Sequence, residues 1–160
     1  MSDSFECRAF PPNFPPQLPM HGFVFADADL PLPRGTRINV PFANPLLLSG
    51  ATSTGAGITV LEAGIYRVQY DLTLTFDGPG NYDFGVGIST NGLTNLTAST
   101  ARRAGEFSGV TSPTMVDQLN KTVIVQVAGP TTFSVVVTNN STGAGSERIQ
   151  LASLSVTQIV

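Results

Sequence analysis

Charged side chains are scarce in this sequence of 160 residues. Lysine, arginine, aspartate and glutamate make up 12% of it, about half of the roughly 25% that is usual for soluble globular domains. There is one lysine, Lys121, and the net charge is −3. Proteins that bind nucleic acids need an excess of basic residues to displace counterions from phosphates. We therefore expect no nucleic-acid partner.

Residues that commonly carry catalysis or bind metals are also rare. The chain has one cysteine, Cys7, and one histidine, His21, whereas a zinc site or a nucleophile with its base needs more of them. Asp71, Asp77 and Asp83 could in principle serve a glycosidase or bind calcium, but the calcium-loop pattern is absent and solvated carboxylates are the simpler interpretation. We expect no enzyme activity, no metal and no cofactor.

Long hydrophobic runs are missing as well. No stretch approaches the 18 consecutive apolar residues of a membrane-spanning helix, and the first residues lack the basic and then apolar pattern of a signal peptide. We expect no membrane insertion and synthesis in a cytoplasm. Because 41% of the residues are hydrophobic and the net charge is small, the chain should fold, and its length suits one domain.

Proline is concentrated at the N-terminus, where nine of the twelve prolines precede residue 46. This composition predicts an extended, acidic arm over residues 1–21, followed by a folded domain over 22–160. Residues 1–33 carry four acids and one arginine, which accounts for the whole net charge. The arm either docks on an apolar groove of its own or a neighbouring domain, or remains a flexible tail.

The rest of the chain has the pattern of β-strands. Apolar and polar residues alternate without a break from Gly64 to Phe76 and again from Tyr82 to Ile88, with turn residues from Asp77 to Asn81 between them. Asn91-Gly92 is the signature of a tight hairpin, because both positions tolerate a positive φ. These segments predict long antiparallel strands.

The later segments repeat the pattern over shorter lengths. Val123–Val127 and Phe133–Val137 each place alternate residues on one face, whereas Ile149–Val156 changes phase and predicts a bulge near Ala152 and Ser153. Met115–Asn120 could form a single helical turn. About eight strands at this spacing predict an all-β, antiparallel jelly-roll sandwich.

Two aliphatic residues interrupt the alternation. Ile124 and Val136 lie on the faces opposite the expected core, so a lone sandwich would expose them. Each exposed aliphatic side chain forgoes roughly 1.5–3 kcal/mol of burial, which a contact between subunits would recover. We therefore expect an oligomer interface at Ile124 and Val136. Cys7, which has no partner within the chain, is either an incidental free thiol or the site of an intermolecular cross-link.

The segment Gly57–Thr75, with Gly-Ile-Tyr opening a long alternating strand, resembles the jelly-roll domains of the C1q and tumour-necrosis-factor (TNF) type. Together with Gly22–Ala26 and the closing Leu154–Val160, it also resembles the exosporium basal-layer family BxpB/ExsF of bacterial spores. That resemblance implies a C1q/TNF-like jelly roll that assembles as a trimer. It also implies a structural, non-enzymatic role at the spore surface.

The resemblance further implies particular partners. Members of the family are similar to the C-terminal head of the collagen-like spore glycoprotein BclA and anchor its filaments in the exosporium, beside other basal-layer proteins. They are made in the mother-cell cytoplasm. Attachment through the leader would involve Cys7, and with it the acidic residues Asp3 and Glu6. The alternative is a trimeric C1q-like head that recognises a glycan or a protein through the loops Asp77–Tyr82 and Asn139–Gly145.

Overall fold

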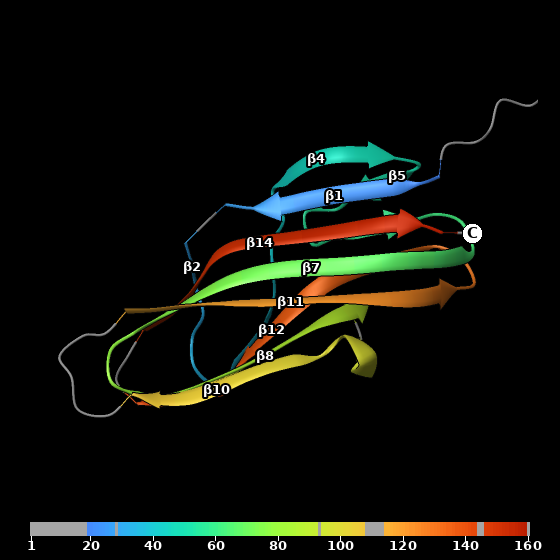
Figure 1. Cartoon of the computed structure of the whole chain (residues 1–160). Helices are drawn as coiled ribbons and strands as arrows, with labels where there is room; N and C mark the ends of the chain where they lie inside the picture. The colour runs from blue at the N-terminus through green and yellow to red at the C-terminus, as the bar shows by residue number, and fades with distance from the viewer. Residues whose placement is uncertain (1–18, 28, 93, 108–113, 144–145, 160) are drawn as a thin grey trace, which may run out of the picture.

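The computed structural model describes residues 19–27, 29–92, 94–107, 114–143 and 146–159, and within them it is a sandwich of two antiparallel sheets. Figure 1 shows one sheet in front of the other. The front sheet, here called sheet A, has the order β11 (Thr114–Val127), β7 (Gly64–Asp77), β14 (Ser146–Gln158), β1 (His21–Ala26) and β4 (Asn44–Ser49), with β2 (Leu30–Pro31) beside β14. The long alternating segment of the sequence is β7, as predicted.

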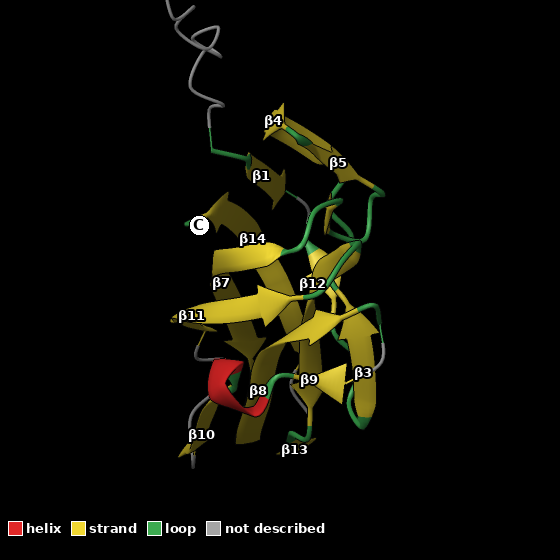
Figure 2. Cartoon of the chain, turned by 90° about the vertical axis from the view of Figure 1, so that its right-hand side faces the viewer, coloured by secondary structure: helices red, strands yellow, loops and turns green. Residues whose placement is uncertain are grey.

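The second sheet, here called sheet B, has the order β10 (Ala101–Phe107), β8 (Gly80–Thr90), β12 (Thr131–Asn139), β6 (Ile58–Val60) and β5 (Ala51–Ser53). The short strands β3 (Thr36–Asn39), β9 (Thr94–Asn95) and β13 (Thr142–Gly143) are paired at its sides. Figure 2 shows β4 and β5 at the upper end of the two layers. The described part of the chain contains one 3₁₀ turn, η1 (Thr97–Ser99). No helix in it is long and apolar enough to cross a membrane.

The core lies between the two sheets and consists of the alternate residues that the sequence pattern predicted. On β7 they are Tyr66, Val68, Tyr70, Leu72, Leu74 and Phe76, each at most 1% exposed. The Tyr70 hydroxyl donates to the carbonyl of Ser99, which ties η1 to the core (3.1 Å). Burial raises the pKa of Tyr70 to about 12, because the phenolate would lose its hydration there.

A connecting segment from β2 to β3 holds one end of the sandwich. Arg34 Nε donates to the buried carboxylate of Glu147 at 2.9 Å, and the Glu147 side chain is 3% exposed. The Asn139 side chain donates to the carbonyl of Leu32 at 2.7 Å, and the amide of Leu32 donates to the carbonyl of Glu147 at 2.9 Å. This segment therefore links β14 in sheet A to β12 in sheet B.

Local expectations about turns and bulges were largely accurate. Asn91-Gly92 lies in the turn between β8 and β9, with φ of 54° and 72°, and this turn joins the paired residues Thr90 and Thr94, one residue more than a two-residue hairpin. The bulge in β14 lies between Ile149 and Leu151, slightly earlier than predicted. The helical turn expected over Met115–Asn120 is wrong, because these residues belong to β11 and pair along their whole length with β7.

Candidate functional site

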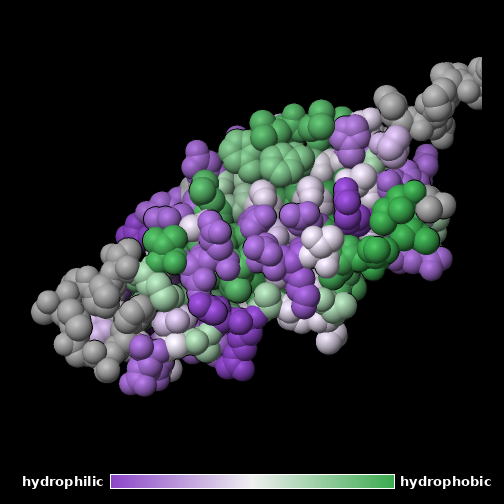
Figure 3. Space-filling view, in the orientation of Figure 1, coloured by the Kyte–Doolittle hydropathy of each residue, from purple (hydrophilic) through white to green (hydrophobic). Residues whose placement is uncertain are grey.

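The outer face of sheet A carries an unusual amount of apolar surface. Phe23 and Phe25 alternate outward on β1, beside Leu46 and Leu47 on β4 and Leu151 on β14. Leu46 is 64% exposed and Leu151 is 51% exposed. Figure 3 shows hydrophobic side chains gathered along this upper rim of the face. These five residues are called the β1/β4 patch below.

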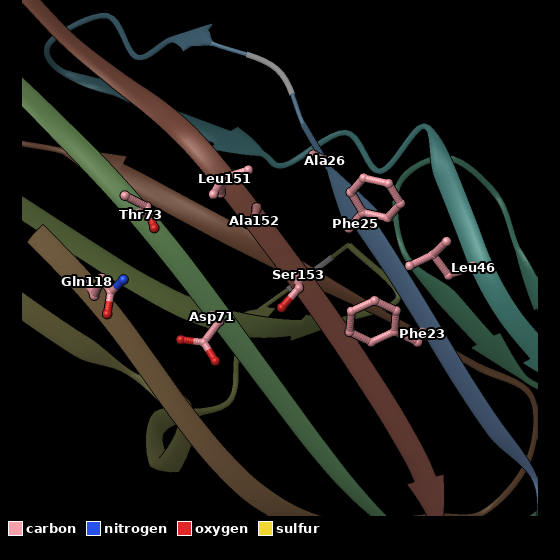
Figure 4. Close-up of a pocket in the computed structure, with 10 residues that line it drawn as sticks. All are labelled: Phe23, Phe25, Ala26, Leu46, Asp71, Thr73, Gln118, Leu151, Ala152 and Ser153. Carbon is pink, nitrogen blue, oxygen red and sulfur yellow. The ribbon is translucent and has the colours of Figure 1, made fainter. Parts of the chain in front are cut away.

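The β1/β4 patch borders a groove of about 380 Å³. Phe23, Phe25, Leu46 and Leu151 line its apolar side, and Asp71, Thr73 and Gln118 lie on its other side (Figure 4). The rings of Phe23 and Phe25 lie beside Leu46, and their strand, β1, is next to the strand that carries Ser153. The groove is shallow and faces outward, which suits a protruding apolar side chain better than an enclosed small molecule.

A second apolar group, the isoleucine corner, lies at another part of the same face. It consists of Ile65, Ile124 and Ile159, and the amide of Ile159 donates to the carbonyl of Ile65 at 2.8 Å. Ile124 is 69% exposed and Ile159 is 48% exposed. Between the two groups lie polar residues of β7 and β14, such as Gln69, Asp71 and Ser155. Figure 3 shows a hydrophilic band between the hydrophobic areas of this face. One face thus presents two separate apolar areas.

The two predicted interface residues have different surroundings. Ile124 is exposed on the outer face of sheet A, as its place in the alternation predicts. The same expectation is wrong for Val136, which is 2% exposed. Val136 lies on β12, inside sheet B, between Gly87 of β8 and Asn39 of β3, and its neighbour Ser134 on the same face is also buried. The face opposite the core is covered at this point, so Val136 cannot serve an interface.

The carboxylates considered for chemistry lie on two different sheets, with Asp71 and Asp77 on β7 and Asp83 on β8. Asp71 is exposed on the outer face of sheet A, whereas Asp83 lies on β8 of sheet B and accepts two hydrogen bonds from Arg102, each 2.7 Å long. These hydrogen bonds from Arg102 lower the pKa of Asp83. No group of three or more His, Cys, Asp or Glu residues suited to a metal occurs in the described part of the chain.

The residues predicted for attachment belong to the leader. Cys7, Asp3 and Glu6 lie outside the described residues. His21 begins β1, and its Nδ1 lies 3.1 Å from the carbonyl oxygen of Pro19. The first described residues therefore lead directly into the strand that carries Phe23 and Phe25.

The two loops proposed for ligand recognition are adjacent. Thr142 of β13 pairs with Asn81 of β8, and the amide of Asn140 donates to the carbonyl of Asp83 at 2.8 Å. Together with β10 these segments border an open groove of about 490 Å³, called the polar groove below. It lies on sheet B, away from the β1/β4 patch.

Comparison with solved structures identifies the arrangement of strands. The globular domain of zebrafish complement 1qA protein superposes with a TM-score of 0.52 at 12% identity, over 89% of this chain and 98% of that one. The fold is a C1q/TNF-like jelly roll. The TNF Eiger from S. frugiperda matches it similarly, with a TM-score of 0.51 at 9% identity, over 89% of this chain and 94% of that one. No family model and no curated protein sequence matches the chain.

The C1q/TNF-like sandwich thus presents surfaces that the sequence interpretation missed. Phe23 and Phe25 alternate with the core residues Val24 and Ala26, so their outward direction could have been predicted from β1 alone. Leu151 follows directly after the bulge, and its phase depends on where the bulge falls. Both outer faces of the described sandwich present exposed side chains, which are apolar on sheet A and polar around the groove of sheet B.

Proposed function

We propose that this jelly roll is one protomer of a homotrimer that assembles through the outer face of sheet A. The observation that supports it is the presence of the β1/β4 patch and the isoleucine corner on one face. Apolar patches of this kind mark interaction sites on soluble proteins, and burying each leucine or isoleucine contributes roughly 1.5–3 kcal/mol.

The two areas suit a head-to-tail contact. The β1/β4 patch is hollowed by its groove, whereas Ile124 is 69% exposed at the isoleucine corner. If the isoleucine corner of one protomer enters the β1/β4 patch of the next, each subunit uses two different surfaces, and a suitable rotation closes the ring. The number three rests on the resemblance of the sequence to C1q/TNF-type heads.

The test of this assembly is the variant Ile124→Asp. Light scattering should give three times the chain mass of 16.8 kDa for the wild type and the mass of one chain for the variant, because the contact would strip the carboxylate of its water, a cost that pairing with the neighbouring Arg67 would not offset. Circular dichroism should be the same for both proteins, since Ile124 lies outside the core. Leu61→Asp is the matched control, because Leu61 is also exposed (53%) but lies between β6 and β7. A monomeric wild type, or a trimeric Ile124→Asp variant, would contradict the proposal.

We further propose that the trimer is a structural subunit of the bacterial spore surface, in the exosporium basal layer. There it would anchor a collagen-like filament glycoprotein of the BclA kind. The resemblance to the BxpB/ExsF family supports this proposal, and so does the low charge content, because a subunit packed permanently into a shell has less need of charge to remain dispersed. The acidic, proline-rich leader with Cys7 would make the attachment.

Deleting residues 1–18 tests the anchoring role in a sporulating bacterium whose spores carry collagen-like filaments. We expect the truncated protein to fold and to form trimers, but to be washed from purified spores under conditions that retain the full chain. Cys7→Ser separates a cross-link from simple docking, because it removes only the thiol. Full retention of the truncated protein on spores would exclude the leader as the anchor.

A ligand-binding head is the second candidate. It is favoured by one observation, namely that the loops around Asn81 and Asn140 lie side by side and border a groove. The leader deletion distinguishes the two functions, because a binding head would keep its ligand affinity without the leader.

A further inference from the structure

The polar groove is built from three neighbouring segments of sheet B. Asn81 and Asp83 of β8 lie at its centre, Ala104 and Glu106 of β10 are their cross-strand partners on one side, and Asn140 and Thr142 border the other side. Asn81, Glu106, Asn140 and Thr142 are exposed. The groove therefore presents amide, hydroxyl and carboxylate groups to solvent within about 490 Å³.

The charges of the polar groove select against some ligand classes. The carboxylate of Glu106 disfavours phosphorylated or sulfated ligands, whereas the charge of Asp83 is balanced by Arg102. The nearby guanidinium of Arg102 already donates twice to Asp83, at 2.7 Å each, so it is occupied by that carboxylate. A long apolar peptide finds little to contact here, since the lining is mainly polar. Amides that donate and accept, beside carboxylates that accept, match the hydroxyl groups of a neutral sugar.

The backbone around the polar groove is held in place by several hydrogen bonds. The amide of Asp83 donates to Ser141 Oγ at 2.9 Å, and the amide of Ser141 donates to Asn139 Oδ1 at 2.9 Å. Asn139 is itself buried and bonded to the carbonyl of Leu32 at 2.7 Å. The side chains on this loop are thus presented by a rigid support, which lowers the entropic cost of binding.

A glycine beneath the polar groove makes room for a core side chain. Gly105 pairs with Tyr82 across β10 and β8, and a Cβ atom at position 105 would lie 2.2 Å from the Tyr82 hydroxyl oxygen. The Tyr82 ring, which packs against Phe76 and Phe84, therefore extends beneath Gly105. Any side chain at position 105 would therefore displace this ring from the core that supports the groove.

We propose that the polar groove binds a neutral oligosaccharide through Asn81, Glu106 and Asn140, without a metal ion. This inference deepens the second candidate function and rests on it. It is independent of the trimer, because the polar groove and the apolar face of sheet A lie on different sheets.

The test is binding of the full chain to an array of neutral and acidic oligosaccharides, followed by calorimetry with the best neutral binder. We expect at least a tenfold loss of affinity for Asn81→Ala and for Asn140→Ala, and a smaller loss for Glu106→Gln, which keeps the shape. Asn39→Ala is the matched control, since Asn39 is an exposed asparagine of sheet B that pairs with Val136, outside the groove. Addition of a chelator should change nothing.

Three results would overturn the sugar site. These are no binding to any neutral oligosaccharide, binding only to acidic glycans or to a protein, and binding that survives the double variant Asn81→Ala/Asn140→Ala. Light scattering on the same samples distinguishes a failure of sugar binding from a failure of trimer assembly. The groove variants should have the same molar mass as the wild type.

Discussion

Replacing Gly57 by alanine is expected to destabilise the fold severely. Gly57 is buried just before β6, and a Cβ atom there would lie 2.0 Å from the carbonyl oxygen of Phe133 and 3.2 Å from the Cα atom of Ser134. These atoms belong to the backbone of β12, so no change of side-chain rotamer can relieve the overlap. The strands β6 and β12 would have to separate, with a loss of more than about 3 kcal/mol.

Thermal unfolding followed by circular dichroism measures this effect. A loss of that size should lower the melting temperature by roughly 10 °C in a domain of this length, or prevent soluble expression. Gly129→Ala is the control, because a Cβ atom at Gly129 would have no heavy atom within 4 Å. Equal melting temperatures for Gly57→Ala and Gly129→Ala would show that β6 does not pack against β12 as described.

The second large effect is expected at the Arg34–Glu147 ion pair. Arg34→Met would leave the Glu147 carboxylate, whose side chain is 3% exposed, without the guanidinium at 2.9 Å. A buried charge that loses its partner destabilises a protein by about 3–5 kcal/mol. Because Glu147 lies on β14 and Arg34 on the segment between β2 and β3, the connection between the two sheets should loosen first.

Chemical denaturation of two further variants separates the charge from the packing. Arg34→Met/Glu147→Leu should recover most of the loss, since it removes both charges and keeps apolar volume. Arg148→Met, at the next position, breaks only the pair with Asp29, in which both side chains are about half exposed, and should cost less than about 1 kcal/mol. A loss for Arg34→Met no larger than that for Arg148→Met would contradict this account.

Much of the fold could be predicted from alternation alone. The unbroken pattern in β7 predicts both the length of the strand and the face that is buried. An apolar residue at every second position places all of these side chains on one face of the sheet. Met115–Asn120 misled the sequence interpretation because six residues are too few to separate a helical turn from a strand. Their pairing with Phe76–Asp71 of β7, which is distant in sequence, decides the conformation.

The candidate surfaces were harder to predict for a different reason. Alternation tells on which face Ile124 and Val136 lie, but it does not tell whether that face is covered. Ile124 is on β11, at the side of sheet A, and is exposed, whereas Val136 lies between two neighbouring strands in sheet B and is buried. Likewise the polar groove depends on the contact between Asn81 and Thr142, about sixty residues apart, which no local pattern reveals.

The position of β14 has a consequence for how the protein is made. β14 is the last strand in the sequence, yet it lies in the middle of sheet A, between β7 and β1. On a ribosome, β1 and β7 would emerge long before the strand that joins them, so sheet A cannot close until residues 146–158 have been synthesised. Such late, long-range pairing makes folding slow and leaves apolar strand surfaces exposed meanwhile. The groove beside β1, to which β14 contributes Leu151, is therefore completed only after synthesis of the domain, and subunits cannot meet correctly while they are still being translated.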